Sequence, residues 1–126
     1  KSGGEVWERF DGSILAVWVA KTGLGNAVRR SANVSRRMFK AARECGYRPG
    51  MGLAPGVARI SAESKRPASG WELEGPFYLA RWMMNFSVHR GRILITQVFA
   101  RQLSQNVQLI GRMALQTNHN INIYEI

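Results

Sequence analysis

The chain has 126 residues, of which 45% are hydrophobic and 21% are charged, a composition that is typical of a folded globular domain and excludes wholesale disorder. Eighteen Lys and Arg residues against eight Asp and Glu give a formal net charge of +10 at pH 7, which favours an anionic partner such as nucleic acid or an acidic protein surface. A single cysteine excludes an internal disulfide and a multi-cysteine zinc site. We therefore expect residues 1–126 to form one basic α+β domain, with residues 1–4 flexible.

The chain begins with a predicted β-hairpin. Two apolar runs, residues 6–10 and 13–20, flank an Asp11-Gly12 pair, which is typical of a tight turn. The second run is apolar on both faces and predicts a central strand of a sheet, or else the first turns of a helix.

Residues 26–46 predict one long amphipathic helix of roughly 30 Å, with Asn26 as the N-cap and Gly46 as the C-terminal stop. Its two sides differ in chemistry, because apolar residues recur at helical spacing and cations lie opposite them. The predicted core side consists of Leu24, Val28, Ser31, Val34, Met38, Ala41, Ala42 and Cys45, and the basic side consists of Arg29, Arg36, Lys40 and Arg43, flanked by Arg30 and Arg37.

A Gly/Pro-rich segment follows at residues 47–56, and its glycines match no nucleotide-binding pattern. Residues 57–64 and 71–74 predict a second hairpin, whose turn carries Lys65 and Arg66. The aromatic block at residues 77–86 predicts either core or the surface of a homo-oligomer.

Residues 93–116 predict a second helix, because Phe99, Leu103, Val107 and Ile110 share one side of a helical wheel. Residues 121–126 predict a closing strand. The expected fold class is α+β, with two main amphipathic helices packed on one antiparallel sheet built from the two hairpins and the closing strand.

The charge pattern predicts a non-enzymatic basic module that binds nucleic acid, or another polyanion, mainly through its phosphates within a larger assembly such as a virion or a ribonucleoprotein. An assembly subunit that meets acidic protein neighbours is the alternative binding class. We expect no cofactor and no metal. The predicted nucleic-acid-binding residues are Arg29, Arg30, Arg36, Arg37, Lys40, Arg43, Arg48, Lys65 and Arg66.

A small metal-independent ribonuclease of the toxin kind is the enzymatic alternative. His89 and His119 are the only histidines, and two imidazoles can serve as general base and general acid in RNA cleavage. Arg90 or Arg92 would then stabilise the phosphorane. This mechanism requires the two histidines to converge in the fold.

The order of elements also resembles the small neck or tail-completion proteins of tailed bacteriophages: a basic helix, a Pro/Gly loop, a strand pair, the stretch GPFYLAR at residues 75–81 and a further helix. The resemblance implies a non-enzymatic, ring-forming role at the head-to-tail junction. The chain departs from that pattern at residues 82–87, where the family tends to have an acidic stretch with Gly-Thr, and in its closing strand. With no secretion signal and no apolar run long enough for a membrane, we expect a cytoplasmic or virion-associated protein.

Overall fold

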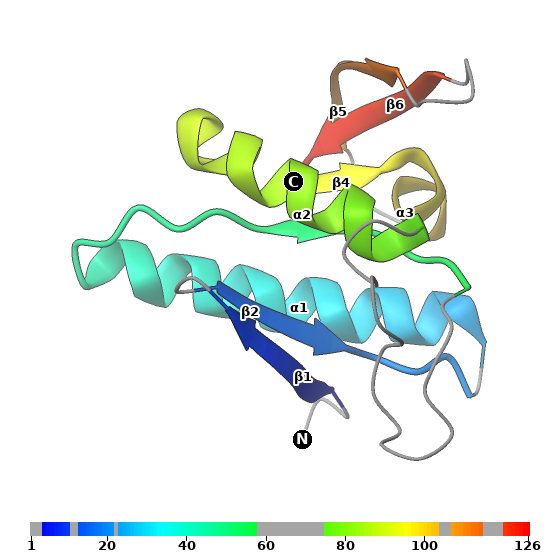
Figure 1. Ribbon diagram of the computed structural model, residues 1–126, viewed down its shortest axis with the longest axis horizontal. Coiled ribbons are helices and arrows are strands. Elements are labelled where there is room, and N and C mark those ends of the chain that lie inside the picture. Colours follow the sequence, from blue (N-terminus) through cyan, green and yellow to red (C-terminus); the bar gives the residue numbers. More distant parts are fainter. Residues whose placement is uncertain (1–3, 11–12, 22, 58–74, 104–106, 115–119) are drawn as a thin grey trace.

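The structure is a computed structural model that describes residues 4–10, 13–21, 23–57, 75–103, 107–114 and 120–126. Three helices and six strands are formed in this part of the chain (Figure 1). In chain order they are β1 (Glu5–Phe10), β2 (Ser13–Val17), α1 (Leu24–Glu44), β3 (Gly52–Leu53), α2 (Gly75–Arg90), β4 (Leu94–Thr96), α3 (Gln97–Gln102), β5 (Gln108–Ala114) and β6 (Asn120–Glu125).

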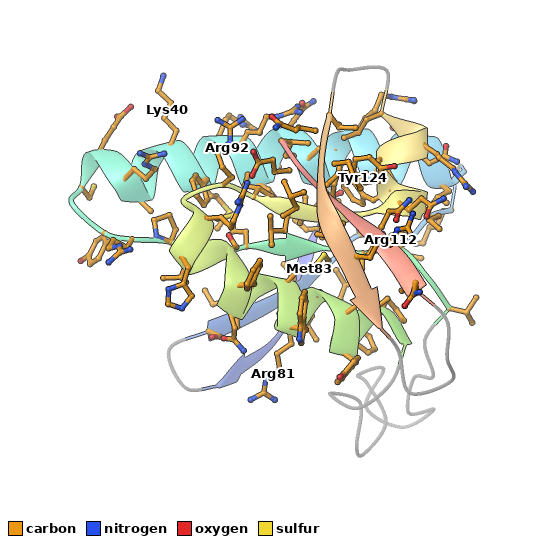
Figure 2. All side chains as sticks on the ribbon, turned by 90° about the horizontal axis from the view of Figure 1, so that it is seen from above. Lys40, Arg81, Met83, Arg92, Arg112 and Tyr124 are labelled. Atoms are coloured by element: carbon orange, nitrogen blue, oxygen red, sulfur yellow. The ribbon has the colours of Figure 1, made fainter. Side chains whose placement is uncertain are left out.

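The α+β class, with two main helices on a sheet, is confirmed. A four-stranded sheet has the order β3-β4-β6-β5, and the long helices α1 and α2 lie on its opposite faces (Figure 1, Figure 2). The sheet is mixed rather than purely antiparallel, since β3 pairs with β4 in parallel while β6 runs antiparallel to β4 and β5. The parallel pair follows from the connection between β3 and β4, which contains α2 and so crosses back over the sheet.

The first hairpin is confirmed, because β1 and β2 pair antiparallel on either side of residues 11–12. Its predicted place in the main sheet is wrong, since β1 and β2 form a separate two-stranded sheet. The exposure of β2 alternates between neighbouring residues, as in a strand with one covered face, and not as in a central strand. The predicted second hairpin, apart from the exposed Val57, lies outside the described residues.

The core is divided by the sheet into two clusters. Neighbouring side chains on β4 point to opposite faces, so that Ile95 packs with Val28 and Phe39 on the α1 side, whereas Leu94 packs with Met83 on the α2 side. All five of these side chains are less than a tenth exposed. Burial of β4 on both faces explains the uninterrupted apolar run at residues 93–95.

The long helix α1 is confirmed, but its predicted orientation is wrong. Met38 is 52% exposed and Cys45 is exposed, although both were expected in the core. Residues 38 and 39 project about 100° apart, so only one can point into the core, and the aromatic ring of Phe39 buries the larger apolar area there. The buried side is thus rotated by roughly 60° from the predicted one. It consists of Ala27, Val28, Ser31, Ala32, Ser35 and Phe39.

The two ends of α1 differ from each other. Gly46 terminates the helix as predicted, with a φ of 89° that favours glycine. Its N–H donates to Arg43 O and the Tyr47 N–H donates to Ala42 O, each at 3.0 Å, which is the Schellman arrangement. The N-cap is Gly23, without a side-chain cap, so the prediction of Asn26 is wrong by one turn of helix.

The predicted helix at residues 93–116 is wrong. This segment forms β4, the short helix α3 and β5, which pairs with β6. Thr96 sets the boundary between β4 and α3, because its hydroxyl accepts the Phe99 N–H at 3.4 Å as an N-cap. The closing strand is confirmed as β6.

The aromatic block forms most of α2, and the Gly/Pro segment before it passes close beneath this helix. A Cβ atom on Gly52 would lie 2.3 Å from Ala80 O and 2.7 Å from Met83 Cβ, and one on Gly50 would lie 2.4 Å from Met84 O. These glycines therefore permit close backbone packing against α2.

Candidate nucleic-acid interface

Four cations from two distant segments line one groove. Arg36, Lys40 and Arg43 come from the C-terminal half of α1, and Arg92 comes from the connection between α2 and β4. The groove has a volume of about 470 Å³. Figure 2 shows Lys40 and Arg92 on the α1 side of the sheet, whereas Arg81 points from α2 to the opposite side of the molecule. The rest of the lining consists of Phe39, Glu44, Gly91, Ile93 and Ile126.

The rotation of α1 creates this arrangement. Positions 36, 40 and 43 are spaced four and three residues apart, so their side chains form one stripe along the helix. Because Phe39 faces the core, this stripe lies at the border between α1 and the sheet rather than at the outermost surface. Arg36 is accordingly half-buried, while Lys40 and Arg43 remain exposed.

Arg43 is held against the protein by two contacts. Its guanidinium carbon lies over the Phe39 ring, 6.0 Å from the ring centroid, a cation–π distance. Its Nη1 donates a hydrogen bond of 3.4 Å to Gly91 O. The hydrogen bond to Gly91 joins the end of α1 to the turn that carries Arg92.

Arg92 is positioned by a buried serine. The hydroxyl of Ser87, which is 0% exposed, donates to Arg92 O at 2.6 Å and accepts the Met51 N–H at 2.9 Å. The Ser87 hydroxyl thereby connects the end of α2, the residue before β3 and the connection to β4. Gly91 has a φ of 66°, which allows the chain to reverse between Arg90 and Arg92.

Glu44 is the acidic side chain among the residues that line the groove. Lys40 Nζ lies 3.9 Å from Glu44 Oε1, one helical turn further on, and both side chains are more than half exposed. An exposed pair of this kind contributes little energy and is screened by salt. It therefore leaves most of the positive charge of the groove available to a ligand.

The structure describes three of the four residues of the enzymatic alternative. His89 is exposed near the end of α2, and Arg90 forms an ion pair with Glu125, with 2.9 Å between Nη2 and Oε2. Arg92 lines the groove instead. His119 lies outside the described residues, so the ribonuclease stays an alternative.

The other predicted nucleic-acid-binding residues that the structure describes do not line this groove. Arg29 and Arg37 are exposed elsewhere on α1, Arg30 is half-buried on α1, and Arg48 is exposed after the helix. Lys65 and Arg66 lie outside the described residues.

Sequence reasoning missed the apolar part of the groove and assigned Arg92 only to the enzymatic alternative. Phe39 could have been found, because a phenylalanine among cations on a helix is a strong candidate for burial. The approach of Arg92 to α1 depends on the turn after α2, which no local pattern in the sequence predicts.

The part of the chain with described coordinates contains no group of three or more His, Cys, Asp or Glu residues that could hold a metal ion. Nor does a described helix combine the length and the apolar character needed to cross a membrane. Comparison of the sequence with known protein families and with curated proteins found no match to either.

Proposed function

We propose that the protein is a non-enzymatic module that binds nucleic acid through its phosphates, within a larger assembly such as a virion or a ribonucleoprotein. The observation that supports this proposal is the convergence of Arg36, Lys40, Arg43 and Arg92 on one groove. Cations that converge from separate segments provide several contacts to a chain of phosphates, and such contacts supply most of non-specific affinity.

The charge of the whole chain supports the same proposal. A net charge of +10 attracts a polyanion from a distance and raises its association rate at low salt. Guanidinium groups also match phosphate geometry, because they donate two parallel hydrogen bonds. Three of the four groove cations are arginines.

The assembly subunit is a second candidate, which the outer face of α2 favours. Trp82 and Phe86 are 36% and 46% exposed, and their rings stack with 5.6 Å between centroids. Exposed aromatic residues on a helix that is apolar on several sides are typical of protein contacts. A homo-oligomer would join copies through this face, which lies on the other side of the sheet from α1.

The experiment that tests nucleic-acid binding is a salt titration against single- and double-stranded RNA and DNA. We expect the affinity to fall linearly on a log-log plot as salt rises, because each phosphate contact releases counterions. Binding that does not depend on salt would contradict the proposal. Binding to an acidic protein or to anionic vesicles but to none of the nucleic acids would also contradict it.

A parallel incubation separates this proposal from the ribonuclease. Highly purified protein is incubated with RNA beside His89→Ala and His119→Ala variants prepared identically. We expect the RNA to stay intact with all three proteins and the affinity to change little. Metal-independent cleavage that both substitutions abolish would establish the enzyme, because removal of a proton-transfer group costs roughly 100- to 10,000-fold in rate.

A further inference from the structure

The groove has two chemically different parts. Its sides carry Arg36, Lys40 and Arg92, whereas Phe39, Ile93 and Ile126 form an apolar part of its lining. Phe39 and Ile93 also belong to the core and are 7% and 3% exposed, so they offer the groove little apolar surface and serve mainly to support the cations above them. The volume of about 470 Å³ is in the range of small-ligand sites. The volume of the groove is therefore large enough for a nucleobase beside its phosphate.

Arg43 differs from the other three cations in how it is held. The Phe39 ring lies beneath its guanidinium, and Gly91 O accepts a hydrogen bond from Nη1. The side chain is nevertheless exposed and lines the groove, so the contacts with Phe39 and Gly91 restrain it without burying it. Guanidinium groups restrained in this way are stacking surfaces for unpaired bases.

We infer that the groove binds single-stranded nucleic acid, with one unpaired base stacked on Arg43 and the adjoining phosphates on Arg36, Lys40 and Arg92. This inference rests on the proposed phosphate binding and adds the form of nucleic acid that is recognised. A duplex hides the faces of its bases within its own stack, so it offers the groove phosphates alone. A single strand offers the groove both the face of a base and the adjoining phosphates.

The first test compares two single strands of equal length and equal phosphate number, one with bases and one composed of abasic residues. We expect the strand with bases to bind about tenfold more tightly at the same salt concentration, the effect typical of one stacked base. A fluorescent purine analogue in the single strand should change its emission on binding. The same analogue within a duplex should not, because its neighbours already stack on it.

The second test substitutes Arg43→Lys, which keeps the positive charge and removes the planar group. We expect this variant to bind the abasic strand as the parent does and to lose most of the tenfold preference for bases. Arg36→Lys is the matched control, since it makes the same chemical change at a groove position assigned to phosphate. It should change the affinity for both strands by the same factor.

The outcomes separate this inference from the proposed function. Equal affinity of the parent protein for both strands would overturn base stacking and leave phosphate binding intact. No binding to either strand would overturn both. If Trp82→Ala abolished the preference for bases while Arg43→Lys retained it, the base would lie on α2 and the assignment to the groove would be wrong.

Discussion

Arg90 and Glu125 form an ion pair that joins the last residue of α2 to the last residue of β6, with 2.9 Å between Nη2 and Oε2. The Glu125 side chain is 10% exposed, whereas that of Arg90 is 41% exposed. Two residues later, Arg92 is exposed in the groove. Two arginines that are close in sequence therefore have different roles, one in stability and one in the candidate site.

This difference predicts that alanine at position 90 lowers stability, whereas alanine at position 92 weakens binding. Arg90→Ala leaves a mostly buried carboxylate without its charged partner, and we expect it to lower the free energy of unfolding by about 1–2 kcal/mol, after allowance for the partial exposure of the pair. Arg92→Ala should leave the free energy of unfolding within about 0.5 kcal/mol of the parent and weaken nucleic-acid binding. Urea denaturation and a binding titration on both variants check these expectations. The prediction fails if Arg90→Ala weakens binding more than Arg92→Ala does while the protein stays equally stable.

Adjacent residues on α1 test its orientation. Phe39→Ala removes a side chain that is 7% exposed and should cost about 3–5 kcal/mol in the free energy of unfolding. Met38→Ala removes a side chain that is 52% exposed and should cost less than about 1 kcal/mol. The free energy of unfolding of each variant is measured in urea. Equal losses would mean that the buried side of α1 is not the one described.

Two glycines in strands form a matched pair for the packing of β3 against α2. Gly52→Ala places a Cβ atom 2.3 Å from the backbone oxygen of Ala80, and we expect a loss of about 1–3 kcal/mol. Gly111→Ala on β5 meets no atom within 4 Å and should be neutral or slightly stabilising, because alanine restricts the unfolded chain. Thermal melts of both variants give the comparison. A Gly52→Ala variant as stable as the parent would show that α2 lies further from β3.

Sequence patterns predicted the elements whose period was unambiguous. The span from Asn26 to Gly46 repeats apolar residues at helical spacing, and it lies almost wholly within α1. The Asp11-Gly12 pair between apolar runs predicted the β1–β2 hairpin in the same way. In both cases the local sequence alone favours the structure.

The pattern failed where tertiary packing decided between alternatives. Phe99, Leu103 and Val107 are four residues apart, which fits a helix. Leu94 and Ile95, however, are buried on opposite faces of the sheet, and this burial requires a strand at the start of the segment. Thr96 then caps a short α3, and Leu103 ends it with extended backbone. Apolar residues at a regular spacing in the sequence do not specify which other elements will cover their side chains.

The candidate site was predicted in part. The basic character of α1 was evident, and Arg36, Lys40 and Arg43 were among the predicted nucleic-acid-binding residues. Their grouping with Arg92 depends on the rotation of α1 and on the turn after α2. Both features follow from long-range packing, which the sequence pattern did not predict.

The most direct test of phosphate binding in the groove compares two triple variants with the same change of charge. The groove triple is Arg36→Gln, Lys40→Gln and Arg92→Gln, and the control triple removes Arg29, Arg37 and Arg48, which are exposed cations outside the groove. The measurement is the slope of log affinity against log salt for a single-stranded oligonucleotide, with folding checked by a thermal melt. We expect the groove triple to flatten the slope by roughly 2–3, since each lost phosphate contact removes about 0.7–0.9, and the control triple to change it by less than about 1. Equal flattening by both triples would contradict a defined groove and would mean that the charge of the protein acts without a specific site.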